Sequence, residues 1–130
     1  MRSKLLLALT VAAGMLAVCK PALAHHGTSF YDLTKSITSK ATMTGLHWEN
    51  PHCVLEFETK DDKGVVTHWA VETYSPLYLT RAGWTKDTLK PGDEITITFH
   101  PAKNGTGIGY IRDGDGKIIL KGKNLSLVEL

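Results

Sequence analysis

Residues 53–73 read CVLEFETKDDKGVVTHWAVET, a stretch in which two alternating apolar segments flank a short polar one. In both flanking segments nearly every second residue is apolar, which is the period of a strand with one buried face. The DDKG between them is typical of a hairpin turn, because its glycine adopts the positive φ that such turns need. The stretch therefore predicts two antiparallel strands, the first with Cys53, Leu55 and Phe57 on its core side.

One helical segment follows this hairpin. Ser75 is a preferred helix N-cap, and Pro76 fits the first helical position. Gly83 fits the position just past the helix end. On either side of this region, ITSKATMTG (37–45) and EITITFH (94–100) alternate as strands do. These signals predict a strand before the hairpin and another after the helix.

Two more strand-like segments lie near the C-terminus, GIGYIRD (107–113) and GKIILKG (116–122). We expect the DGDG at 113–116 to join them as a hairpin turn, and LSLVEL (125–130) to add a short final strand. Three strands, a helix and two more strands is the layout of the OB-fold. We therefore predict a mainly β protein, a small OB-like five-stranded antiparallel barrel with one short helix between strands three and four. A generic antiparallel sheet with one packed helix is the alternative.

The N-terminus has the features of an export signal. A basic MRSK precedes an apolar run at 5–18, and ALA at 22–24 has the small residues that a signal peptidase recognises. The apolar run is too short to span a bilayer, so we expect no membrane span. We expect residues 1–24 to be cleaved and the mature protein to be periplasmic or secreted. The alternative is a lipoprotein signal that would leave a lipidated Cys19.

Cleavage changes the charge and the cysteine count. The whole chain has 15 Lys and Arg and 13 Asp and Glu; three basic residues leave with the signal and no acidic one does, so 12 basic residues face 13 acidic ones. Nucleic-acid binders show a basic surplus or patch, so we expect no nucleic-acid partner. We divide the mature chain into an arm at 25–36 and one domain at 37–130. Cys53 is then the only cysteine, either a buried core residue or a soft metal ligand.

His25 and His26 would begin the mature chain. An N-terminal histidine offers its α-amine and a ring nitrogen to one metal ion, and a histidine in second place chelates through the amine, the intervening amide and its ring. Both arrangements suit tetragonal Cu(II), which prefers nitrogen ligands. We therefore predict a metal site, with copper the best match, at His25 and His26. A solvated tail is the alternative, because chain termini are often loose.

The first expected loop, LHWENPH (46–52), contains two more histidines. His52 follows a proline turn and faces away from the core by alternation, so we predict it as a third metal ligand. His47 lies five residues earlier, and the two rings could converge across the turn. The spacing matches no zinc signature, and a turn histidine that hydrogen-bonds local backbone is the alternative.

The same loop supplies the candidate ligand-contact residues His47, Trp48 and Asn50, and His100 borders a second loop, PAKNGTG (101–107). In OB-folds these two loops border the ligand-binding face, so we expect them to lie together at one mouth of the barrel. The alternative function is therefore an interaction module in which Trp48, Asn50 and the 101–107 loop bind a protein or a carbohydrate without metal.

Several short motifs follow one another along the mature chain: AHH at 24–26, WENPH at 48–52, WAVE at 69–72, SP at 75–76, GW at 83–84 and LKPGD at 89–93. In this series the chain resembles a family of small exported bacterial proteins classed as a domain of unknown function. The resemblance implies export and a β-rich fold, and it implies no reaction. Members usually have H-H-S where this chain has Gly27, a change that keeps both imidazoles and removes a hydroxyl.

These observations favour an exported binding protein over an enzyme. The expected partner is a metal ion or an unidentified periplasmic molecule. Ser75 and Ser126 lack the surroundings of a catalytic nucleophile, and no acid/base pair is recognisable. An N-terminal-histidine copper enzyme is the enzymatic alternative.

Overall fold

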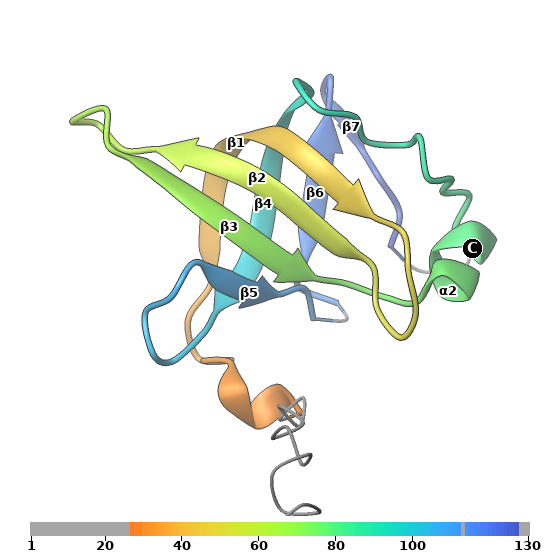
Figure 1. Ribbon diagram of the computed structural model, residues 1–130, viewed down its shortest axis with the longest axis horizontal. Coiled ribbons are helices and arrows are strands. Elements are labelled where there is room, and N and C mark those ends of the chain that lie inside the picture. The colour runs from red at the N-terminus through yellow and green to blue at the C-terminus, as the bar shows by residue number, and fades with distance from the viewer. Residues whose placement is uncertain (1–26, 113, 128–130) are drawn as a thin grey trace, which may run out of the picture.

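The computed structural model describes residues 27–112 and 114–127, which form a β-barrel with one short α-helix (Figure 1). The barrel strands are β1 (Ile37–His47), β2 (Val54–Lys60), β3 (Val66–Glu72), β4 (Glu94–Pro101) and β5 (Ile108–Tyr110). Helix α2 (Pro76–Arg81) lies between β3 and β4, and the 3₁₀ turn η1 (Thr28–Phe30) precedes β1. The predicted mainly β, OB-like barrel with its helix between the third and fourth strands is confirmed.

The ring closes through β1 and β5. The first half of β1 pairs with β4 and its second half with β2, so β1 belongs to both sides of the barrel. Strand β5 pairs antiparallel with β4 on one edge and parallel with β3 on the other. The ring is therefore antiparallel except for the β3–β5 seam, where Ala70, Val71 and Glu72 face residues 108–110.

The expected hairpin around DGDG is wrong. Strand β5 and strand β6 (Lys117–Leu120) both pair antiparallel with the same edge of β4, with Tyr110 opposite His100 and Lys117 opposite Thr98. Two strands that are both antiparallel to a third run in the same direction, so they cannot be the two arms of one hairpin. Strands β5 and β6 act as one interrupted strand, and the described residues between them, 111–112 and 114–116, form an excursion outside the strands.

The hairpin in this region is instead formed by β6 and the short β7 (Lys123–Asn124). A strand was expected over 125–130. Residues 125–127 form no strand, and 128–130 lie outside the described residues.

The core follows the alternation read from the sequence. Its members are the inward residues of the strands together with helix and loop residues that close the ends: Ala41, Met43, Cys53, Leu55, Phe57, Val71, Leu79, Trp84, Leu89, Ile95, Ile97, Phe99, Ile111, Ile118 and Leu127. Cys53 is fully buried, and burial raises the pKa of its thiol, so it packs as a small apolar residue. Cys53 is therefore part of the core.

The helix begins and ends where its capping residues predict. The Ser75 side chain accepts a hydrogen bond from the backbone N–H of Tyr78 at 3.3 Å, and Pro76 is the first helical residue. Gly83, just past the end, has a φ of +89°. Trp84 follows and is buried in the core, and its indole N–H donates to the carbonyl of Ser126 at 2.7 Å. In the described residues, no helix is both long enough and apolar enough to cross a membrane.

Candidate functional site at the N-terminal arm

The arm that precedes β1 is attached to the loop that follows β4. The backbone N–H of Asp32 donates to the carbonyl of Pro101 at 2.9 Å, and that of Lys103 donates to the carbonyl of Phe30 at 3.1 Å. Tyr31 forms an isolated antiparallel bridge with Ala102 between these two bonds. Residues 30–32 are thus fixed on the barrel as a short added strand segment.

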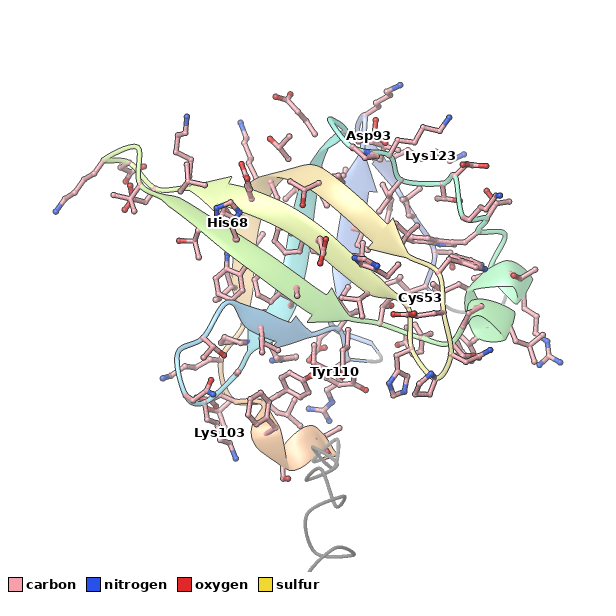
Figure 2. The ribbon with its side chains drawn as sticks, viewed as in Figure 1. Cys53, His68, Asp93, Lys103, Tyr110 and Lys123 are labelled. Carbon is pink, nitrogen blue, oxygen red and sulfur yellow. The ribbon has the colours of Figure 1, made fainter. Side chains whose placement is uncertain are left out.

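Tyr31 provides the side-chain anchor of the arm. Its ring is only 7% exposed and stacks on Tyr110 with centroids 5.2 Å apart. Its hydroxyl donates to Oε2 of Glu72, at the end of β3, at 2.8 Å. Burial, and then the hydrogen bond and negative charge of Glu72, raise the pKa of Tyr31, so the phenol remains a donor at neutral pH. Figure 2 shows Tyr110 between β5 and η1, where this anchor forms.

A second anchor is the buried side chain of His100. Its Nδ1 lies 2.5 Å from the carbonyl oxygen of Lys35, and its Nε2 lies 3.2 Å from each carboxylate oxygen of Asp115. Each ring nitrogen of His100 therefore faces a hydrogen-bond acceptor. His100 therefore connects the arm, strand β4 and the excursion between β5 and β6, and its two nitrogens are occupied within the protein.

Of the three predicted metal ligands, only His52 lies within the described residues. His25 and His26 lie outside them. His52 is exposed in the 48–53 loop, and Gly27, the first described residue, is exposed too. Figure 1 shows η1 below β5 and the loop between β1 and β2 to the right, near α2. Among residues 27–112 and 114–127, no cluster of three or more His, Cys, Asp and Glu side chains is arranged to hold a metal ion.

The other candidate contact residues lie in different environments. His47 is exposed and its Nε2 lies 3.1 Å from Oε2 of Glu56, so its near neighbour is a carboxylate. Trp48 is half-buried and packs against the core, whereas Asn50 is exposed and precedes a cis proline. Within the 48–53 loop, Asn50 and His52 are therefore the exposed polar candidates.

The two loops that we expected at one mouth lie apart. Figure 1 shows the loop between β1 and β2 on one side of β5 and the loop between β4 and β5 on the other. The parallel seam explains this, because β5 begins opposite Ala70 in the middle of β3. The backbone N–H of Cys53, at the end of the first loop, instead donates to the carbonyl of Tyr74, beyond the end of β3. The arm, and not the 48–53 loop, lies against the 101–107 loop.

Sequence reasoning missed three residues of the arm anchors, Tyr31, Glu72 and Asp115. The arm has no periodicity, and its partners are 41 and 65 residues away along the chain. The usable signal was the aromatic pair Phe30 and Tyr31 in a mostly polar arm, because large aromatic side chains favour burial against an apolar surface.

Comparison with known proteins gives a family and no activity. Residues 12–111 match a protein family described as a family of unknown function, DUF6152. No curated protein and no solved structure shows significant similarity to the chain.

Proposed function

We propose that this chain, which belongs to the DUF6152 family, is an exported, non-enzymatic binding protein that holds a divalent metal ion at its mature N-terminus. Copper is the best match. The α-amine and imidazole of His25 and the imidazole of His26 are the primary ligands, and His52 is the third imidazole.

The observation that carries this proposal is the attachment of the arm at Phe30, Tyr31 and Asp32. Consecutive Cα atoms lie 3.8 Å apart, so the Cα of His25 lies within about 8 Å of that of Gly27. A metal bound by the first two mature residues is therefore restricted to the end of the barrel where the arm attaches. A restricted N-terminus loses less conformational freedom on binding than a free tail does.

The donor set suits copper for chemical reasons. Amine, imidazole and deprotonated amide nitrogens favour the tetragonal geometry of Cu(II), which also has the highest affinity among divalent first-row ions. A free α-amine titrates near ~8, so it becomes available close to neutral pH. Amine coordination requires cleavage after Ala24, which links the proposed site to export.

The test uses mature protein that begins at His25. We expect it to bind one Cu(II) per chain with the electron paramagnetic resonance spectrum of a tetragonal nitrogen site. Adding one alanine before His25 is expected to weaken binding by at least tenfold, because the amine then belongs to another residue. His52→Ala is expected to change the spectrum and to lower the affinity.

His68→Ala is the matched control. His68 is also exposed, lies 3.1 Å from a carboxylate oxygen of Glu58, and is placed on β3 away from η1 in Figure 2. This variant should retain the spectrum and the affinity. Unchanged binding in the alanine-extended protein, or in a double His25→Ala, His26→Ala variant, would overturn the metal-binding proposal.

A second candidate is an interaction module, and a groove of about 430 Å³ favours it. This groove lies on the outer side of β2 and β3 beside the start of β5, and it includes His68, Trp69 and Ile108. Ile108 is 37% exposed there. If the groove binds a protein or a carbohydrate, Ile108→Ser should abolish capture of that partner while copper uptake remains. Loss of both together would contradict a separate interaction site.

A further inference from the structure

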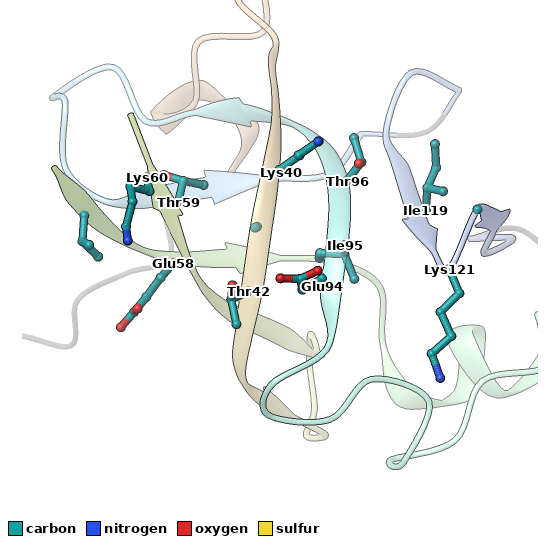
Figure 3. Close-up of a pocket in the computed structure, with 13 residues that line it drawn as sticks. Lys40, Thr42, Glu58, Thr59, Lys60, Glu94, Ile95, Thr96, Ile119 and Lys121 are labelled. Atoms are coloured by element: carbon teal, nitrogen blue, oxygen red, sulfur yellow. The ribbon is translucent and has the colours of Figure 1, made fainter. Parts of the chain in front are cut away.

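A larger groove of about 800 Å³ crosses the outer face of β2, β1, β4 and the end of β6 (Figure 3). Its volume lies in the usual range for small-molecule sites. Its accessible aliphatic part comes from Val66 and Ile119, with the lysine side-chain stems beside them. Ala41 and Ile95 also border the groove, but they are buried in the core. Val66 is 42% exposed at this edge, although it is apolar. None of the residues used in the proposed metal site lines this groove.

Three lysines border the groove without acidic partners. Lys40, Lys60 and Lys121 come from β1, β2 and the turn after β6, and Figure 3 shows them spread around the groove. None of the three forms an ion pair with another residue of the described ranges. Of the two lining glutamates, Glu58 already lies 3.1 Å from the imidazole of His68. The lysines therefore provide positive charge that the described residues do not neutralise.

Lys121 has a backbone conformation that does not suit lysine. It and Gly122 form the two-residue turn between the paired residues Leu120 and Lys123, with φ values of +51° and +77°. Two consecutive positive φ angles define a type I′ hairpin turn, whose first position favours asparagine, aspartate or glycine. Lysine at this position makes the turn less stable than asparagine would. Lys121 nevertheless lines the groove, on its β6 side.

We propose that this groove binds an elongated aliphatic dicarboxylate. The ammonium groups of Lys40 and Lys60 bind one carboxylate, and that of Lys121 binds the other. The aliphatic body lies along Ile119 and the lysine stems. The separation of the lysines around the groove favours two charged ends over one, and the aliphatic lining favours a hydrocarbon body over an inorganic anion.

Isothermal titration with decanedioate tests this proposal at low ionic strength, where exposed charges interact most strongly. We expect one molecule to bind per chain. Lys121→Asn is expected to weaken binding at least fivefold and, in the same protein, to raise the midpoint of urea unfolding because asparagine suits the turn. Glu94→Gln is expected to tighten binding, since it removes a negative charge from the lining.

Lys103→Asn is the matched control, because it removes one positive charge from the 101–107 loop, outside the groove. It should leave the affinity within twofold. Two further ligands separate the contributions: 1,10-decanediol keeps the hydrocarbon body without charge, and sulfate keeps charge without the body. The proposal would be overturned if decanedioate does not bind, or if 1,10-decanediol or sulfate binds as tightly as decanedioate does. It would also be overturned if Lys121→Asn leaves the affinity for decanedioate unchanged. The metal titration is independent of all these outcomes.

Discussion

The hydroxyl of Tyr31 links the arm to β3 and gives the arm a measurable pH dependence. Its pKa is raised in the folded protein, whereas an unfolded tyrosine ionises near ~10. Above that pH the unfolded state releases the proton first, so this group makes stability fall as pH rises. The expected slope reaches about 1.4 kcal/mol per pH unit.

Tyr31→Phe should remove this part of the alkaline destabilisation. We expect the variant to be less stable than the wild type at pH 8, because Glu72 loses the hydrogen bond from Tyr31. The difference in the free energy of unfolding should shrink as pH rises past 10. Urea unfolding at pH 8, 9, 10 and 11 measures it. A stability difference that stays constant over this range would show that the phenol does not remain protonated in the folded protein.

Thr73 is a buried residue whose hydroxyl finds no hydrogen-bond partner in the described part of the chain. A buried hydroxyl without a partner is unfavourable, so Thr73→Val should raise the free energy of unfolding by up to about 1 kcal/mol.

Thr59→Val provides the comparison of opposite sign for this prediction. The Thr59 hydroxyl accepts the indole N–H of Trp69 at 3.0 Å, and its loss should lower stability by about 1 kcal/mol. The urea-unfolding midpoints of the two variants and the wild type at pH 7 measure both changes in stability. Destabilisation by both substitutions would mean that Thr73 has a polar partner.

At the scale of elements, local signals predicted the strands and the helix well. Alternation predicted the buried faces of β2 and β4, and Ser75, Pro76 and Gly83 predicted the helix limits. These signals act within a few residues, so they can be read from the sequence. The relation of β5 to β6 could not be read in this way. A DGDG sequence suits either a hairpin or an excursion, and only the pairing of both segments with β4 distinguishes the two.

The same limit applies to the candidate site. The assignment of His25, His26 and His52 as metal ligands stays a prediction from the sequence. The sequence could not predict that Tyr31 and His100 attach the arm. Both attachments depend on partners brought close by the barrel, Glu72 for one and Asp115 and Lys35 for the other. Short-range patterns contain no information about such pairs.

We expect the contact between Asp115 and His100 to hold the excursion between β5 and β6 against the barrel. Asp115→Ala leaves Nε2 of the buried His100 without its acceptor. A hydrogen bond to a charged group contributes roughly 1.5–3 kcal/mol, so we expect a loss of stability of about that size at pH 6. Thermal unfolding followed by circular dichroism measures it.

Asp62→Ala, at the exposed β2–β3 turn, is the control for charge removal and should change stability by less than about 0.5 kcal/mol. If Asp115→Ala behaves like this control, the contact with His100 does not hold the excursion in place.

At the scale of the whole molecule, barrel closure depends on the parallel seam between β3 and β5, which spans only three residue pairs. Gly109 is buried at its centre, opposite Val71. A Cβ at this position would lie 2.5 Å from a ring carbon of Phe99, closer than Cβ atoms pack, and 3.0 Å from a methyl group of Val71, which is a tight contact. Glycine is therefore required here by the close approach of the two sides of the barrel.

Gly109→Ala should force the seam or the Phe99 ring to move. Overpacking of a core typically costs about 1–3 kcal/mol, and we expect the urea midpoint to fall accordingly. The near-ultraviolet circular dichroism should also change, because Phe99 packs edge-on against Trp69 with centroids 4.8 Å apart. Gly27→Ala is the matched control, since a Cβ there has no atom within 4 Å. Wild-type stability in Gly109→Ala would mean that β3 and β5 do not pack this closely, and the barrel would then be open at this seam.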